Sequence, residues 1–280
     1  MTRSTAAFVA IAYTLAVVIG AAVARTGKHG FAYLTMFIPA IAVLVVSTTT
    51  GEGLRIDWKR LPLRYAPLAL LLIPSLLHSV MMPLTAALEG GLPWQDWLTP
   101  GADGLFHNPA DRGWGTLTTG GLAARLAMNA LVGLAVVSGL AFFEEIGWRA
   151  WLLPRVVAKS GPRRAVLIVA MLWALWHVPF IVSGMYPAFN ARPGVLQLTA
   201  VMVMGNIAFG LVIGWLWLRT ESIWIVTLAH GSLNNWGQYA FKFMRDFRFA
   251  NDLLVLAAGI AAVLVVGTAL LAFAVPSRSP

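Results

Sequence analysis

The sequence predicts an all-α fold, a polytopic membrane bundle of about eight transmembrane helices. Of the 280 residues, 59% are hydrophobic and only 11% are charged, and the mean hydropathy is +0.77. A soluble domain carries about 25% charged residues. The apolar residues also run in long blocks, each near or above the roughly 20 residues that a helix needs to cross a bilayer. Composition and block length together indicate a protein that spans the membrane several times.

Eight apolar blocks follow one another along the chain, at about residues 5–24, 31–51, 66–88, 122–153, 165–186, 195–218, 222–241 and 253–275. Arg3 precedes the first block, as in a signal peptide, but the apolar run is longer than a signal-peptide core and favours a retained helix. By these blocks the chain divides into N-terminal transmembrane helices with an extracytoplasmic loop (1–120), a helical core (121–241) and a C-terminal transmembrane helix (242–280).

The basic residues predict the orientation of the bundle, because cytoplasmic loops carry an excess of lysine and arginine. Eight helices place the connections 52–65 and 149–164 on one side, and both are rich in basic residues. We therefore expect a multi-pass protein of the cell membrane with both termini in the cytoplasm. Two smaller basic groups fall on the other side: Arg25 with Lys28, and Lys242 with Arg245 and Arg248.

Charge and cysteine content exclude other classes of protein. The formal net charge is +9, but the basic residues are spread over loops and chain ends, so we expect no nucleic-acid partner. The chain contains no cysteine, which excludes disulfides, thiolate catalysis and thiolate metal sites.

Three charged residues, Glu144, Glu145 and Arg149, lie close together toward the end of the fourth block. An ionised side chain inside the membrane costs roughly 2.5–3.5 kcal/mol on insertion scales, so each requires a partner or a function. Glu145 and Arg149 are four residues apart on one helix face, and we expect a supporting ion pair. Glu144 points about 100° away and has no such partner. Trp148, four residues further on, would shield Glu144 from water, which suits a general base.

Three more polar residues lie in later blocks: His177, His230 and Asn234. His230 and Asn234 are one helical turn apart and share a face. At a rise of 1.5 Å per residue, Glu144 and these three residues lie about 14–20 Å from the cytoplasmic ends of their helices. We therefore expect the four side chains to meet at similar depth. A single histidine would more often be a packed residue bonded to a backbone carbonyl.

This cluster could support hydrolysis in two ways. A glutamate and a histidine can deprotonate water, while a histidine and an asparagine can donate hydrogen bonds to an oxyanion. Alternatively, Glu144, His177 and His230 could bind zinc and leave one position open for water. The sequence contains neither the H-E-x-x-H pattern of zinc proteases nor a G-x-S-x-G elbow.

At these residues the sequence resembles the CPBP family of intramembrane proteases, also called the ABI family, which includes type II CAAX prenyl endopeptidases and bacteriocin-processing relatives. The family motif E-E-x-x-x-R is matched by Glu144, Glu145 and Arg149, and H-x-x-x-N is matched by His230 and Asn234. A third motif, F-x-x-x-H, lies between them. The three motifs agree with the family in order and spacing over roughly residues 120–240.

The third motif differs from the family at one position. His177 matches its histidine, but Trp173 stands where the family usually has phenylalanine. An aromatic ring is kept one turn before the histidine, so we expect the chemistry to be unchanged.

The resemblance implies an intramembrane endopeptidase whose partners are membrane lipid and a peptide or prenylated-protein substrate. It implies catalytic roles for Glu144 and His177 in activating water, for His230 and Asn234 in stabilising the oxyanion, and supporting roles for Glu145 and Arg149. Since asparagine is a poor zinc ligand and a good hydrogen-bond donor, we expect no cofactor, and zinc remains the alternative. Neither the substrate nor the oligomeric state follows from the resemblance.

Two rival functions use the same residues differently. A proton-coupled transporter would need polar residues along a path through the bilayer, whereas here they gather at one depth, and no pair of broken helices occurs in corresponding halves. A non-catalytic immunity protein could keep the fold without the reaction, although the complete set of motifs argues against it.

Overall fold

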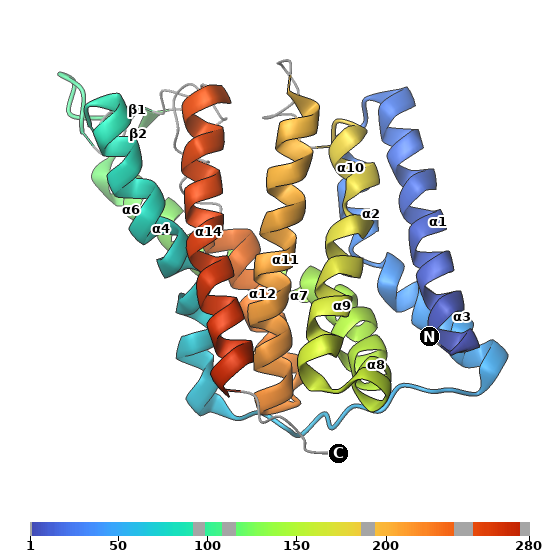
Figure 1. Ribbon diagram of the computed structural model, residues 1–280. Helices are drawn as coiled ribbons and strands as arrows, with labels where there is room; N and C mark the ends of the chain where they lie inside the picture. Colours follow the sequence, from blue (N-terminus) through green and yellow to red (C-terminus); the bar gives the residue numbers. More distant parts are fainter. Residues whose placement is uncertain (1, 92–98, 108–115, 186–193, 238–248, 275–280) are drawn as a thin grey trace.

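The computed structural model is a bundle of long helices (Figure 1) and describes residues 2–91, 99–107, 116–185, 194–237 and 249–274. Within these residues, seven helical stretches are long and apolar enough to cross a membrane. The all-α, multi-pass fold is therefore confirmed. The seventh predicted block, 222–241, forms the shorter α12 (Ile223–Ser232) and the π-helical η6 (Leu233–Gly237), after which it leaves the described part of the chain.

The other elements follow in chain order. The N-terminal part contains α1 (Arg3–Thr26), η1 (His29–Phe31), α2 (Ala32–Thr35), α3 (Ile38–Thr50), η2 (Leu63–Tyr65) and α4 (Ala66–Glu89). A short antiparallel pair that was not predicted comes next, β1 (Phe106–His107) with β2 (Thr116–Leu117). The later helices are α6 (Thr119–Met128), η3 (Asn129–Gly133), α7 (Leu134–Glu145), η4 (Ile146–Leu152), α8 (Leu153–Ser160), α9 (Pro162–Trp176), α10 (Val178–Val182), α11 (Val195–Thr220) and α14 (Phe249–Ala274).

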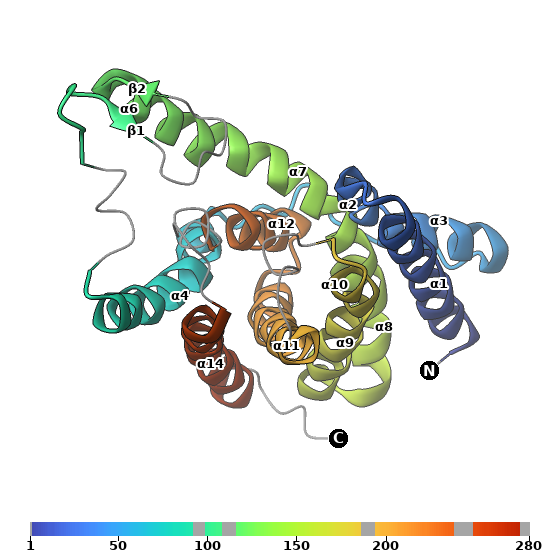
Figure 2. The same ribbon diagram turned by 90° about the horizontal axis from the view of Figure 1, so that it is seen from above.

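The ends of the chain lie on one side of the bundle. The start of α1 and the end of α14 lie at the same end as the connection 51–62 and the turn between α8 and α9, while β1 and β2 lie at the opposite end (Figure 1). Seen from above, α11 lies between α14 and α9 (Figure 2) and packs against both. Helix α12 packs against α7, α4 and α11. It is therefore enclosed by other helices, and its side chains can meet those of α7 inside the bundle.

Glycine allows two close approaches beside the motif residues. A Cβ atom on Gly231 in α12 would lie 2.7 Å from the Ser138 Cα of α7. A Cβ atom on Gly147 in η4 would lie 3.0 Å from the Pro39 Cα of α3. Real Cβ atoms do not approach a backbone this closely, so larger residues would push the helices apart. The approach of α12 to α7 brings the residue next to Gly231, His230, toward Glu145.

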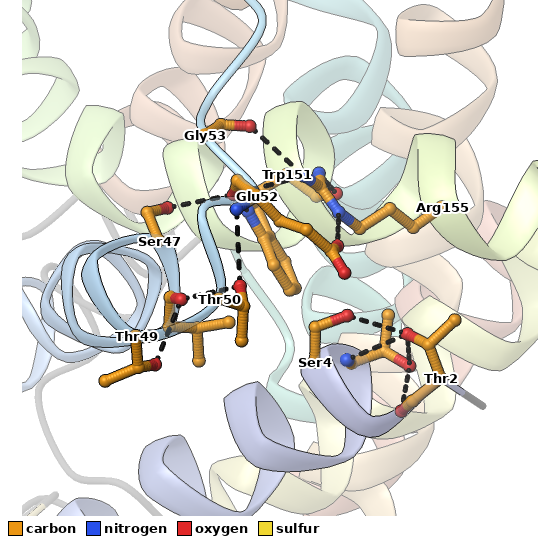
Figure 3. A network of polar contacts seen from close by, with 11 residues as sticks. Thr2, Ser4, Ser47, Thr49, Thr50, Glu52, Gly53, Trp151 and Arg155 are labelled. Carbon is orange, nitrogen blue, oxygen red and sulfur yellow. Dashed lines mark hydrogen bonds and ion pairs between the residues drawn. The ribbon is translucent and has the colours of Figure 1, made fainter.

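The connection 51–62 is fixed to η4 and α8 by a network of polar contacts (Figure 3). Trp151 donates its indole N–H to the Glu52 carbonyl oxygen at 3.1 Å. Arg155 donates to the Glu52 carboxylate at 3.2 Å, and its guanidinium carbon lies 4.0 Å from the centroid of the Trp151 ring. Hydrogen bonds from Ser4 and Arg155 hold the pKa of the Glu52 carboxyl below its usual range. These contacts join the N-terminal helices to the helix that carries the first motif.

The same connection is held at its other end by the turn between α11 and α12. Arg60 donates from Nε to the Thr220 carbonyl oxygen at 2.5 Å. Ser222 returns a hydroxyl hydrogen bond to the Arg60 carbonyl oxygen at 2.6 Å, and Trp224 donates to the Trp58 carbonyl oxygen at 2.9 Å. The connection 51–62 is therefore anchored at both ends and crosses this end of the bundle; we call it the belt.

We expect Gly231→Ala to destabilise the protein by about 1–3 kcal/mol, because its methyl group forces α12 away from α7. The matched control is Gly139→Ala in α7, where a Cβ atom meets nothing within 4 Å. That change gains about 0.5–1 kcal/mol of helix stability. Thermal unfolding in detergent measures both variants, and equal melting temperatures for the two would contradict this account of the packing.

Candidate active site

Two motif segments contain π-helical turns. The first, η4, begins directly after Glu145, and the second, η6, contains Asn234. A π-helical turn uses i→i+5 hydrogen bonds and is wider than an α-helical turn, and such turns are frequent at functional sites. The sequence predicted continuous α-helices here. No residue pattern signals this wider bonding, because it depends on how the helices pack.

Glu145 is fully buried, at 0% exposure, and one of its oxygens accepts two hydrogen bonds. Arg149 Nη1 donates to Glu145 Oε1 at 2.9 Å, so the predicted ion pair is present. His230 Nδ1 lies 2.8 Å from the same oxygen, a contact that the sequence did not reveal. Because a carboxylate oxygen accepts here, Nδ1 of His230 carries a proton and donates it. Glu145 therefore links the end of α7, η4 and α12.

Glu144 is also buried, at 2% exposure, but its partner comes from another helix. The Trp173 indole in α9 donates from Nε1 to Glu144 Oε2 at 2.8 Å. No second hydrogen bond reaches this carboxylate from the described residues, so Oε1 is available to water or substrate. Trp148, which we expected to shield Glu144, packs its ring edge-on against Phe8 and Trp176. It lies in η4, whose wider turn changes the direction of the side chains.

His177 follows directly after α9 and is partly exposed. Its Nδ1 lies 2.8 Å from the Trp173 carbonyl oxygen. A carbonyl oxygen can only accept, so Nδ1 donates, and Nε2 of the neutral ring keeps its lone pair. The rings of Trp173 and Trp176 stand nearly perpendicular to the imidazole, with centroids 5.1 and 4.9 Å away. These contacts fix the ring and leave Nε2 as the free basic atom.

Trp173 connects three of the four residues that we expected to meet. In addition to its bond to Glu144, its ring centroid lies 5.1 Å from that of His177 and 5.3 Å from that of His230. The Arg149 guanidinium carbon lies 4.5 Å from the same ring, a cation–π contact. Trp173 is 1% exposed, so these contacts form in a dry interior.

Asn234 is half-buried in η6, one turn beyond His230, and no hydrogen bond holds its amide within the described residues. The next two residues, Asn235 and Trp236, hold η6 in place instead. Asn235 donates from Nδ2 to the Asn129 carbonyl oxygen at 2.9 Å, and Trp236 donates to the Ala130 carbonyl oxygen at 3.3 Å. Sequence reasoning missed Asn235, although an asparagine that follows a motif asparagine inside a membrane block is itself a signal. These two hydrogen bonds hold η6 against η3 and leave the Asn234 amide without a hydrogen-bond partner among the described residues.

The described residues do not fit a zinc site as they stand. No group of three or more histidine, aspartate or glutamate side chains lies close enough together, within this part of the chain, to hold a metal ion. Glu145 Oε1 is occupied by Arg149 and His230, whereas both motif histidines donate from Nδ1 and keep Nε2 as their second ring nitrogen. A histidine held in this way can bind a metal through Nε2 as well as take part in proton transfer, so the absence of a cofactor stays a prediction.

We expect Arg149→Leu to destabilise the protein by about 3–5 kcal/mol, because it leaves a buried carboxylate with less compensation. The matched control, Arg219→Leu, removes an exposed arginine from the last turn of α11 and costs less than about 1 kcal/mol. Combining Arg149→Leu with Glu145→Gln recovers part of the loss, since the uncompensated charge is gone. Thermal unfolding of all three variants measures the effect. An unchanged melting temperature for Arg149→Leu alone would show that the ion pair is not required.

The segment that carries the three motifs is similar in sequence to known proteins. Residues 125–236 match the sequence model of a family described as "Type II CAAX prenyl endopeptidase Rce1-like". A curated protein of Methanococcus maripaludis, CAAX prenyl protease 2, is 25% identical over 109 residues, which cover 38% of this chain and 39% of that protein. The alignment thus spans less than half of either protein. The matched segment contains all three motifs, so residues 125–236 of this chain are similar to the Rce1-like type II CAAX prenyl endopeptidases.

Proposed function

We propose that the protein is an intramembrane endopeptidase that hydrolyses a peptide bond with an activated water molecule. The observation that carries this proposal is the arrangement around Trp173, where a buried carboxylate with one oxygen unbonded among the described residues lies near two histidines, one buried and one partly exposed. The similarity of residues 125–236 to the Rce1-like type II CAAX prenyl endopeptidases supports the same reaction class. The resulting reaction is a direct attack of water, without a covalent intermediate.

In this proposal Glu144 and His177 activate the water. The free Oε1 of Glu144 and Nε2 of His177 accept hydrogen bonds from it, and one of them takes a proton as the water oxygen bonds to the carbonyl carbon. When the tetrahedral intermediate collapses, the C–N bond breaks and the same proton passes to the departing amine nitrogen. Proton and electron pairs balance within the site, so no further reactant is needed.

His230 and Asn234 are proposed to stabilise the oxyanion. The Asn234 amide donates from Nδ2. Because His230 Nδ1 already donates to Glu145, the ring can donate to the oxyanion only from a protonated Nε2, which requires both ring nitrogens to carry protons. The Glu145 carboxylate compensates that positive charge. A preformed donor pair in a low-dielectric site is worth about 3–4 kcal/mol per donor to the transition state.

The proposed substrate is a membrane-associated peptide, and the first to test is a prenylated peptide that ends in a CAAX sequence. The relative from Methanococcus maripaludis is described as a CAAX prenyl protease. The basic connections 52–65 and 149–164 favour an orientation in which the belt end and both chain ends face the cytoplasm, where such a substrate would arrive. Bacteriocin-type leader peptides are the second class to test.

Glu144→Gln is expected to lower peptide cleavage by at least about 100-fold while the protein stays folded, because the amide has the same shape but cannot take the proton. The matched control is Glu221→Gln, which changes an exposed glutamate paired with Arg60 at the belt. Cleavage of the prenylated peptide by purified protein in lipid vesicles, followed by mass spectrometry, measures both. Full activity of Glu144→Gln would exclude the proposed reaction, and proton flux without cleavage would favour the transporter.

Cleavage is expected to persist in the presence of a strong zinc chelator, because the proposed reaction uses hydrogen-bond donors and a carboxylate base only. The assay is the same vesicle cleavage, with chelator alone and with chelator followed by added zinc. A loss of activity that zinc restores would establish the metal-dependent alternative through Glu144, His177 and His230. The melting temperature with chelator shows whether any loss is structural.

A further inference from the structure

We infer that Trp173 is a positioning residue, one that orients the Glu144 carboxylate through its indole N–H. This inference rests on the proposed function, since it gives Trp173 a part in the same reaction. Its starting point is the 2.8 Å hydrogen bond from Trp173 Nε1 to Glu144 Oε2. It is the one hydrogen bond that Glu144 receives from the described residues, so it alone among them sets the rotation of that carboxylate.

The geometry of Trp173 itself is fixed. The side chain is 1% exposed and has the Arg149 guanidinium over its ring at 4.5 Å. The rings of His177 and His230 stand nearly perpendicular to it, at 84° and 80°. An indole held on several sides cannot rotate without disturbing these neighbours. The direction of its N–H bond is therefore defined before substrate arrives.

The chemistry of the indole suits this role. Its N–H is a donor and never an acceptor, so it cannot take the proton that Glu144 must receive. By binding Oε2 it fixes the plane of the carboxylate and leaves Oε1 as the oxygen without a hydrogen-bond partner among the described residues. The backbone carbonyl of Trp173 meanwhile accepts from His177 Nδ1. One residue thus orients both groups that are proposed to activate water, the carboxylate through its side chain and the imidazole through its backbone.

The substitution at the third motif therefore has a chemical consequence. Sequence comparison alone suggested that tryptophan at this position only preserves an aromatic ring. Phenylalanine would keep the ring contacts with the histidines but would leave Glu144 Oε2 without its donor. In this protein the carboxylate is held by a bond that phenylalanine cannot form.

The kinetic test is Trp173→Phe. A hydrogen bond to a charged group is lost, so kcat is expected to fall about 10- to 100-fold while KM stays within about twofold, because substrate binding is not affected. The matched control is Trp151→Phe, which removes the same atoms from a fully buried tryptophan and breaks a bond to a backbone carbonyl in the belt. Its kcat is expected to stay within about twofold of the original. An unchanged kcat in Trp173→Phe, or equal losses in the two variants, would overturn the inference.

A spectroscopic test is independent of activity and of how well Trp173→Phe folds. In protein labelled with ¹⁵N at tryptophan, the Trp173 indole N–H signal is expected to move in Glu144→Gln, because an amide oxygen is a weaker acceptor than a carboxylate. The Trp151 signal is the internal control and is expected to stay in place. A stationary Trp173 signal would show that the bond is absent. If the signal moves but the original protein cleaves no peptide, the hydrogen bond stands and the endopeptidase proposal fails.

Discussion

An ionised carboxylate inside a membrane has to be compensated within the protein, and Glu145 is where this constraint is strictest. Its Oε1 accepts from Arg149 on the same helix and from His230 on another. The second contact requires α12 to approach α7 closely, which the absence of a side chain at Gly231 permits. The position of His230, and with it that of the following η6 segment, therefore depends on neutralising one buried charge.

The two adjacent glutamates meet the same constraint in different ways. Glu145 accepts hydrogen bonds from two partners, Arg149 and His230, at one oxygen. Glu144 is bound by one neutral donor, the Trp173 indole, and keeps an oxygen without a partner among the described residues. A carboxylate held in this way can exchange a proton without breaking the ion pair beside it. Each glutamate faces a different neighbour. Glu145 therefore compensates the buried charge, and Glu144 is left for the proposed proton transfer.

Much of the fold follows from the sequence, because long apolar blocks have few possible structures in a membrane. The helix spans, the Glu145–Arg149 pair and the gathering of Glu144, His177 and His230 all follow from spacing and depth. Contacts between helices do not, since their rotation is set by packing. For this reason the Glu145–His230 bond, the π-helical turns and the bond from Trp173 were missed. Trp148, the expected neighbour of Glu144, packs against Phe8 and Trp176, and the expectation assumed a regular α-helix through Ile146–Leu152.

The belt formed by residues 51–62 has a consequence for the order in which the protein is assembled. Ser4 and Ser47 precede the connection and contact Glu52, whereas its contacts with η4, α8 and α12 lie between 99 and 166 residues further along the chain. Helices α1, α3 and α4 are therefore synthesised before Trp151, Arg155 and Trp224, the residues that anchor the connection to the rest of the bundle. The last anchor, Trp224, belongs to α12, the helix that also supplies His230. Trp224 and His230 are therefore synthesised within a few residues of each other, so a partly made bundle contains neither the complete belt nor the complete candidate site.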